Sequence, residues 1–389
     1  MHHSLRGALA MAAGACTLAG LAYSGIALMQ MRRFRRTLHT AADVLGVPVT
    51  VLKPLRGLEP RLYENLSSFC RQRFARYQII FGAADAGDPA LAVARRVARD
   101  YPQCDITIVA GRAEYAANPK VGNLLGMMPF VKHPIIVLAD SDIEIDDSYL
   151  STVTAGFTDP QTGAVTCLYG AVPRTGWVSQ LAAMYVNESF APSVLVARAI
   201  EPLNYAFGAT IAVRAGVLEA IGGLSALRDY IGDDYMLGRL VARAGYRVTL
   251  APYVVQTDAT DADLAALWAH ELRWARTIRL QRPAGYAGSV ITNVLPFAFL
   301  FAAASRCAAG YLAFALAALV RVMLSAQARK TFAPSARAGL WLVPVRDVLS
   351  LGVWCAGLSG HGVTWRTRNY NVQSGGRMDE SPVNCNDLV

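Results

Sequence analysis

The pattern of hydrophobic and polar residues divides the middle of the chain into short apolar runs and longer amphipathic stretches. The apolar runs predict strands at 48–55, 77–84, 105–110, 135–139, 163–169, 207–213 and 246–250. The amphipathic stretches predict helices at 60–73, 88–99, 121–131, 147–157, 177–198, 233–244 and 261–280. Because strands and helices alternate, the pattern predicts an α/β fold with a mostly parallel sheet.

The ends of the chain are more apolar than its middle. Residues 8–31 are long enough for a membrane-spanning helix and are followed by Arg32, Arg33, Arg35 and Arg36. Because this charge follows the apolar run rather than preceding it, an uncleaved anchor is favoured over a cleaved signal peptide. Basic residues stay on the cytoplasmic side of a membrane, so the arginines predict that the chain after them is cytoplasmic.

Three further apolar segments, at 288–304, 308–320 and 339–360, are predicted to enter the bilayer, and the basic loop at 329–337 is expected to be cytoplasmic. The pair Arg346-Asp347 interrupts the last segment, where buried charge is costly. Two alternatives therefore remain open for it. Either it spans the membrane with the charged pair facing protein, or it is a re-entrant or interfacial helix.

These patterns predict an N-terminal transmembrane anchor at 1–36, a cytoplasmic domain at 45–284, C-terminal membrane segments at 285–362 and a polar tail at 363–389. The hydrophobic fraction of 54% agrees with a membrane protein. The net charge of +9 contains no dense basic run interleaved with aromatic residues, which argues against a nucleic-acid partner. Seven scattered cysteines without a CxxC pair argue against a disulfide framework and favour a reducing compartment.

Two aspartates follow the apolar strand at 135–139. Alternate residues of an extended segment point the same way, so Asp140 and Asp142 are predicted to share one hard divalent cation, Mg²⁺ or Mn²⁺. Ligands of open α/β sheets collect beyond the carboxyl ends of the strands. An isolated Asp-x-Asp is more often a solvated loop, so the prediction depends on further signals at the same edge of the sheet.

Such signals occur at other predicted strand ends and helix starts, in the motifs VLKPLRG, NPKVGNL, LADSDI, IGDDYMLG and HELRWART. In order and spacing these motifs resemble those of family-two-type glycosyltransferases, most closely ceramide glucosyltransferases and their bacterial relatives in hopanoid biosynthesis. The resemblance covers nearly the whole chain. It implies a nucleotide-sugar-binding, GT-A-like glycosyltransferase fold for 45–284 and an inverting transfer from a UDP-sugar.

The resemblance also implies roles for the acidic residues. Asp140 and Asp142 match the metal-binding pair, whose cation bridges the donor phosphates, although some relatives carry Gly at the position of Asp142. Asp233 and Asp234 match the acidic pair that supplies the general base, which is assigned to Asp234. The alternative for this pair is a capped helix start, where acids are also common.

Other motif residues resemble substrate ligands. Asp85 matches the aspartate that holds the uracil or ribose; Asp88 is the alternative, or else a helix cap. Lys120 matches a nucleotide-contacting lysine, with a solvated surface lysine as the alternative. Arg273 and Trp274 match a diphosphate clamp and an acceptor wall, or an amphipathic helix on the membrane. His270 replaces the usual Gln or Arg of that motif, which leaves its role open.

The amino-acid sequences of the segments FCRQ, DDYMLG and HELRWARTIR are most similar to those of the hopanoid branch. This implies transfer of N-acetylglucosamine to a bacteriohopanetetrol-type lipid at a bacterial-type inner membrane, by a multi-pass protein with a cytoplasmic catalytic domain. A ceramide glucosyltransferase, acting on UDP-glucose and ceramide, is the close alternative. A non-catalytic membrane scaffold is less favoured because no acidic motif is lost. A dinucleotide-dependent redox enzyme is disfavoured because no GxGxxG follows the first strand.

Overall fold

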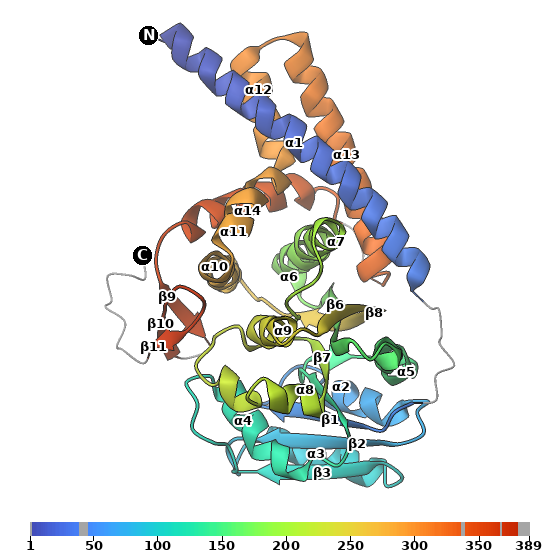
Figure 1. Cartoon of the computed structure of the whole chain (residues 1–389). Helices are drawn as coiled ribbons and strands as arrows, with labels where there is room; N and C mark the ends of the chain where they lie inside the picture. Colours follow the sequence, from blue (N-terminus) through green and yellow to red (C-terminus); the bar gives the residue numbers. More distant parts are fainter. Residues whose placement is uncertain (1, 39–45, 336–338, 366–367, 380–389) are drawn as a thin grey trace.

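The computed structural model describes residues 2–38, 46–335, 339–365 and 368–379. Some predicted features lie partly outside these residues: the start of the cytoplasmic domain at residue 45, the end of the basic loop at 329–337, and the polar tail at 366–367 and beyond residue 379. Figure 1 shows an α/β domain below a bundle of long helices.

The domain is built on an eight-stranded sheet with the order β3-β2-β1-β4-β7-β6-β8-β5. The strands are β1 Val49–Leu55, β2 Tyr77–Ala83, β3 Asp105–Ala110, β4 Ile135–Ala139, β5 Ile143–Glu144, β6 Thr162–Pro173, β7 Thr210–Arg214 and β8 Arg247–Ala259. Strands β1 to β4 are parallel, as are β6 and β8, which confirms the α/β fold with a mostly parallel sheet. Strand β7 is antiparallel to both of its neighbours, and β5 is antiparallel to β8. These directions cannot be predicted from the sequence, because a strand buried on both faces has the same apolar pattern in either direction.

Both faces of the sheet are buried. Leu52 of β1 and its neighbour Ile80 of β2 belong to one apolar core, whereas Val51 and Ile79 belong to the core on the opposite face. This double burial explains why the strands appear as continuous apolar runs. The helices that accompany the sheet are α2 Leu62–Ser68, α3 Ala90–Asp100, α4 Pro119–Met127, α5 Tyr149–Ala155, α8 Ala215–Ala220 and α9 Asp233–Arg243.

The helix predicted at 177–198 is not uniform. It consists of α6 Gly176–Met184, a π-helical segment Tyr185–Phe190 and α7 Ala191–Ile200. Pro192 has no N–H to donate to the carbonyl of Glu188, which removes an α-helical hydrogen bond at the junction. The π-helical segment packs against the apolar segment at 308–332, where Glu188 pairs with Arg321 at 2.8 Å.

The apolar helices α1 His2–Thr37, α12 Val294–Ser305 and α13 Ala308–Phe332 pack together and extend away from the sheet (Figure 1). Within them, Leu5–Thr37 and Ala308–Phe332 are long and apolar enough to cross a membrane. The segments Pro283–Thr292 and Val294–Ser305 pass the same test together, bent by 60°, so the run predicted at 288–304 is not one straight helix. Helix α13 continues beyond residue 320 through Arg329 and Lys330, which therefore lie in its last turn rather than in a loop.

Helix α14 Leu342–Gly357 has 16 residues and crosses between this bundle and α10 Leu264–Gln281 (Figure 1). Its two charged residues are both buried and paired with other helices. Arg346 contacts Glu271 of α10 at 2.6 Å, and Asp347 contacts Arg321 of α13 at 2.8 Å. The charged pair therefore faces protein, and it links the apolar helix α13 to α10.

Part of the predicted polar tail is folded onto the domain. It forms a second sheet of β9 Gly362–Trp365, β10 Arg368–Val372 and β11 Met378–Asp379. Val363, Tyr370 and Val372 are buried against Ile231 and Leu280. The alternating apolar residues in this short segment were not recognised as strands in the sequence, and the segment is a structural element rather than a free tail.

Candidate active site

The carboxyl end of β4 brings Asp140 against Lys120 of α4. Oδ1 of Asp140 lies 2.6 Å from Nζ of Lys120, and Oδ2 of Asp233 lies 3.7 Å from the same nitrogen. Helix α4 begins here because the Asn118 side chain accepts a hydrogen bond from the Lys120 N–H and Pro119 suits the first helical position. Lys120 is therefore part of a charge cluster and is not a solvated surface lysine.

The charge of Lys120 is fixed by its neighbours. Burial alone would lower its pKa, but Asp140, Asp233 and Asp234 raise the pKa above the ordinary value of lysine. A lysine that stays protonated can bind a phosphate, and the carboxylates beside it can bind a cation. Either ion would replace part of the present ion pairing.

Gly208 marks the point at which two distant acidic motifs converge. A Cβ atom on Gly208 would lie 3.3 Å from Oδ2 of Asp234 and 3.6 Å from Oδ2 of Asp140. Both carboxylates therefore border the same bare stretch of backbone, just before β7. Burial and the neighbouring Asp233 raise the pKa of Asp234 to about 6, with Lys120 opposing the shift.

Asp142 lies beside this group on the β8 side. Its Oδ2 accepts a hydrogen bond from Thr257 at 2.9 Å. Burial, Asp140 and Glu59 raise the pKa of Asp142 to about 6. No group of three or more Asp, Glu, His or Cys in the described part of the chain is arranged to hold a metal. Two carboxylates nevertheless fit a cation that is held jointly with substrate phosphates and water, which is the usual coordination of Mg²⁺.

Lys53 is a site residue that the sequence reading missed. Its side chain on β1 is 0% exposed, and its Nζ donates to the main-chain carbonyl of Asp140 at 2.7 Å. Burial lowers its pKa to about 7, although Asp142 and Asp140 oppose this shift. The signal was present, because a lysine within an apolar strand is rarely buried without a specific partner.

The two acids after β2 occupy different environments. Both carboxylate oxygens of Asp88 accept from the Gly57 N–H, at 2.9 and 3.0 Å, and Oδ1 also accepts from the Ala90 N–H at 2.8 Å. Asp88 therefore has the capping role that the sequence left as an alternative. Asp85 is exposed at the end of β2, where its Oδ1 accepts from the Gly87 N–H at 2.9 Å.

Helix α10 presents an aromatic surface. The ring of Trp274 stacks on Tyr185 at a centroid distance of 5.5 Å, and the ring of His270 lies 4.2 Å from that of Trp274. Nδ1 of His270 lies 3.3 Å from Oδ1 of Asp261, so this side chain pairs with its own segment rather than with Asp140 or Asp234.

Tyr169 of β6 is influenced electrostatically both by the acidic residues and by Arg273. Burial raises the pKa of Tyr169, and Asp234, Asp140 and Asp142 add to the shift. The same tyrosine lies close enough to Arg273 to affect its pKa, which burial lowers. Tyr169 therefore lies within electrostatic range of the predicted acids and of the predicted arginine.

The second sheet holds the loop that precedes Asp233 and Asp234. The Ile231 N–H donates to the carbonyl of Gly376 at 3.1 Å, and the Met378 N–H donates to that of Asp229 at 2.6 Å. Because these bonds fix the chain just before α9, the far C-terminal segment positions the two acids. The spacing of the motifs gave no indication of this contact.

Gly376→Val is expected to lower kcat/KM about tenfold. Gly376 has φ +86°, and an added Cβ would lie 2.9 Å from Nε2 of Gln281, so the substitution displaces the carbonyl that binds Ile231. Gly375→Val is the matched control, since Gly375 has φ +87° and a Cβ added there would have no atom within 4 Å. Steady-state transfer rates compare the two, and equal losses would contradict a positioning role for this contact.

The mixed sheet, with carboxylates at the end of β4 and the start of α9, defines a glycosyltransferase fold. A mannosyltransferase from Pyrobaculum calidifontis, solved with GDP-Man and Mn²⁺, has the same fold, with a TM-score of 0.50, 21% identity, and coverage of 91% of this chain and 97% of that one. The chain belongs to glycosyl transferase family 21, whose model matches residues 12–378. The predicted class of enzyme, a glycosyltransferase, is thereby confirmed.

Two similar relatives are ceramide glucosyltransferases of Caenorhabditis elegans. Ceramide glucosyltransferase 3 is 23% identical over 240 residues, which is 61% of this chain and 52% of the relative. Ceramide glucosyltransferase 1 is 20% identical over 344 residues, 86% of this chain and 73% of the relative. The chain thus spans about half the length of the first relative. These matches confirm the ceramide glucosyltransferase-like family, whereas the finer resemblance to the hopanoid branch stays a prediction.

Proposed function

We propose that the protein is an inverting glycosyltransferase that moves a sugar from a UDP-sugar to a hydroxyl of a membrane lipid. The observation that carries this proposal is the convergence of Asp140 and Asp234 on Gly208, in a domain joined to apolar helices through buried ion pairs. One carboxylate belongs to the predicted metal pair and the other is the predicted base. Because both carboxylates lie next to Gly208, a donor diphosphate can bind beside Asp140 while an acceptor hydroxyl binds beside Asp234.

Asp234 accepts the proton of the acceptor hydroxyl. Its pKa of about 6 leaves the carboxylate ionised at neutral pH and still basic enough to share a proton during attack. The oxygen attacks the anomeric carbon from the face opposite the diphosphate, so the configuration inverts. Asp233 contributes indirectly, because it contacts Lys120 and raises the pKa of its neighbour.

The donor occupies the edge formed by β2, β4 and α4. Asp85 accepts hydrogen bonds from the uracil or ribose, and Lys120 and Arg273 bind the diphosphate. Asp140 and Asp142 would hold a divalent cation, and Asp140 is the safer assignment because some relatives carry Gly at the position of Asp142. When bound, that cation neutralises the charge that develops on the departing diphosphate. Asp88 caps a helix, and the ring of His270 packs against Trp274 as part of the aromatic surface of α10.

The acceptor side is formed by the stacked rings of Trp274 and Tyr185, beside the helices that lead to the membrane. The preferred substrates are UDP-N-acetylglucosamine and a bacteriohopanetetrol-type hopanoid, supported by the residues of the motifs at 69–72, 233–238 and 270–279. The second candidate is UDP-glucose with ceramide, supported by the names of the relatives. A non-catalytic scaffold is disfavoured because every acidic motif is retained.

Purified membranes containing the protein, incubated with labelled UDP-N-acetylglucosamine or UDP-glucose, hopanetetrol or ceramide, and Mg²⁺, test this assignment. Labelled glycosyl-hopanetetrol formed from UDP-N-acetylglucosamine is the expected product. Glucosylceramide instead would establish the second candidate. Neither product, with retained UDP-sugar binding, would favour the scaffold.

We also propose a topology for the chain in a bacterial-type inner membrane. Residues 1–36 anchor it, 285–362 return to the bilayer, and 45–284 with the tail at 363–389 are cytoplasmic, as the arginines after the anchor favour. Helix α14 is interfacial, since at 16 residues it is short and carries two buried ion pairs. Protease protection in oriented vesicles tests this arrangement, and protection of the tail would contradict it.

Chelation of divalent cations is expected to stop transfer. Asp140 and Asp142 supply two carboxylates, too few for a complete coordination shell, so the cation is held weakly without donor and EDTA removes it. The measurement is the transfer rate before and after dialysis against EDTA, followed by addition of Mg²⁺ or Mn²⁺. Full activity after dialysis would remove the metal assignment.

Transfer is expected to decline as the pH falls through about 6. The pKa of Asp234 is raised to about 6 by burial and Asp233, and only its ionised form accepts a proton. Well below that pH the rate falls about tenfold per pH unit, whereas above about pH 7 it is constant. The profile is recorded at saturating Mg²⁺, because the pKa of Asp142 is also about 6. A flat profile down to about pH 5 would contradict the assignment of the base.

A further inference from the structure

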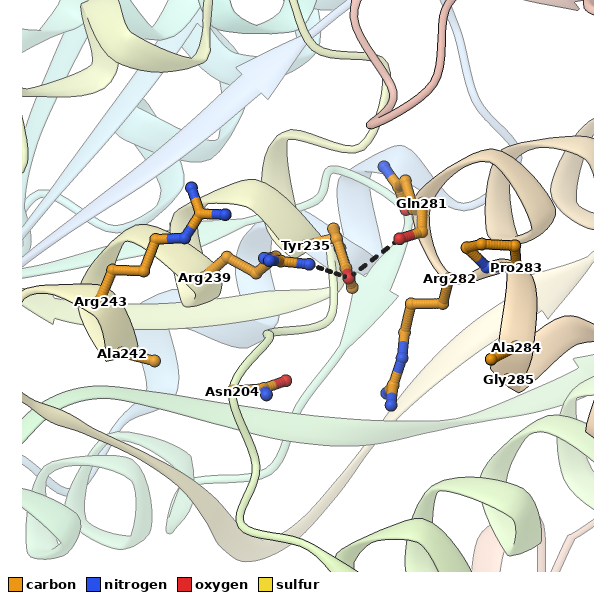
Figure 2. Close-up of a pocket in the computed structure, with 10 residues that line it drawn as sticks. All are labelled: Asn204, Tyr235, Arg239, Ala242, Arg243, Gln281, Arg282, Pro283, Ala284 and Gly285. Atoms are coloured by element: carbon orange, nitrogen blue, oxygen red, sulfur yellow. Dashed lines mark hydrogen bonds between the residues drawn. The ribbon is translucent and has the colours of Figure 1, made fainter.

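A basic pocket of about 440 Å³ lies between α9 and the turn that joins α10 to α11 Pro283–Gly288 (Figure 2). Tyr235, Arg239 and Arg243 form one wall, because residues four apart share a face of a helix. Arg282 stands on the opposite wall. The lining contains three arginines and no acidic residue.

The positive charge of this pocket is only partly compensated. Arg282 pairs with Glu201 and lies over the ring of Tyr205 at 4.9 Å. Nη1 of Arg239 donates to the hydroxyl of Tyr235 at 3.0 Å, as the dashed line in Figure 2 shows. Among the residues that the structure describes, neither Arg239 nor Arg243 has a carboxylate at ion-pair distance. Two guanidinium groups therefore remain for an external anion.

The pocket adjoins the part of the chain that leads to the membrane. Its second wall, at 281–285, runs directly into the bent pair Pro283–Thr292 and Val294–Ser305, which is long and apolar enough to enter a bilayer. In Figure 1, α11 lies next to α14 at the base of the helix bundle. An anion in the pocket would thus lie at the level where lipid headgroups begin.

We propose that this pocket binds the phosphate of an anionic phospholipid headgroup. Guanidinium groups form paired hydrogen bonds with phosphate, and basic pockets beside membrane segments on the cytoplasmic side select anionic lipids. The volume suits a headgroup, being near the lower end of the range for small-molecule pockets. The proposed acceptors are neutral and offer Arg239 and Arg243 no anion to pair with, and the donor diphosphate is assigned to Lys120 and Arg273.

The pocket is connected to the active site through α9. Tyr235 follows Asp234 directly, and its hydroxyl donates to the carbonyl of Gln281 at 3.4 Å. A headgroup bridging Arg239 and Arg282 holds α9, which carries Asp234, against the end of α10, which carries Arg273. We therefore expect anionic lipid to stimulate transfer. The stimulation rests on the proposed function, whereas lipid binding does not.

The test uses the full-length protein in phosphatidylcholine vesicles with and without phosphatidylglycerol. Retention of phosphatidylglycerol is measured by native mass spectrometry, and the transfer rate is measured in parallel. The double variant Arg239→Gln/Arg243→Gln is expected to retain at least about tenfold less phosphatidylglycerol, from several-fold per basic residue, and to lose the stimulation. Arg239→Lys/Arg243→Lys keeps the charge and is expected to retain part of both.

Arg95→Gln/Arg198→Gln is the matched control, because it removes the same charge from exposed positions outside the pocket. This variant is expected to behave as the wild type. Equal phosphatidylglycerol retention by the Arg239/Arg243 glutamine variant and the wild type overturns the proposal, whether or not transfer is detected. In a further arm, inorganic phosphate and glycerol 3-phosphate are added to pure phosphatidylcholine vesicles. Stimulation by either would overturn the lipid assignment and identify a soluble phosphate ligand.

Discussion

Asp234→Asn is expected to reduce transfer by about 10²- to 10⁴-fold while UDP-sugar binding is retained, since that is the usual contribution of a positioned general base. The substitution preserves size, and the new side chain can still accept the hydrogen bond that the Tyr235 N–H donates to Oδ1 at 2.8 Å. Helix α9 therefore keeps its start. What is lost is the basic oxygen that borders Gly208.

Asp233→Asn is the comparison, because it removes one negative charge from the same turn. Its Oδ1 accepts from Asn118 at 3.3 Å, and its Oδ2 lies 3.7 Å from Lys120. We therefore expect a smaller loss, expressed mainly as a higher KM for the donor. The two variants are compared by kcat, KM and UDP affinity from calorimetry. Retained turnover in Asp234→Asn would remove this residue as the base.

The sequence predicted that charged residues of the site lie at one edge of the sheet. Asp140 and Lys120 were predicted at a strand end and a helix start, and in a mostly parallel sheet such positions share one edge. The structure joins them at 2.6 Å. This inference worked because the period of the apolar residues determines which end of each strand carries the polar ones.

Other parts of the site could not be predicted because they depend on tertiary contacts. The direction of β7, which places Gly208 between the two carboxylates, leaves no trace in an apolar run that is buried on both faces. The role of Lys53 depends on the register of β1 against β4. The attachment of the second sheet to Ile231 joins residues far apart in the sequence, through main-chain atoms that carry no sequence signal.

The sequence shows that the two charges of α14 are unusual in an apolar segment, but it does not show which residues pair with them. A charged pair in an apolar segment was costly enough to leave two alternatives open. The structure shows that each charge has a buried partner: Glu271 for Arg346 and Arg321 for Asp347. Glu271 belongs to the motif HELRWART, so the membrane-proximal helix and the active-site helix share one ion pair.

Glu271→Ala is expected to destabilise the protein by about 3–5 kcal/mol, because it leaves Arg346 as an uncompensated buried charge. The side chains of Arg346 and Glu271 are 0% and 2% exposed, and Nη1 and Nη2 of the guanidinium each contact one carboxylate oxygen at 2.6 Å. The expected effect is a fall in Tm of about 5 °C, from the unfolding entropy of a chain of 389 residues. Asp229→Ala is the matched control: its pair with Arg377 is exposed, so its loss should cost less than about 1 kcal/mol.

The double variant Glu271→Leu/Arg346→Met separates stability from positioning. Removing both charges eliminates the unpaired group, so most of the lost stability should return. Transfer should nevertheless be slower than in the wild type, because Arg346 also lies over the ring of Tyr185 at 5.7 Å, and Tyr185 stacks on Trp274. The aromatic wall beside Arg273 thus depends on the guanidinium and not only on a filled space. Recovery of both Tm and kcat/KM in the double variant would show that the ion pair acts solely as a structural link.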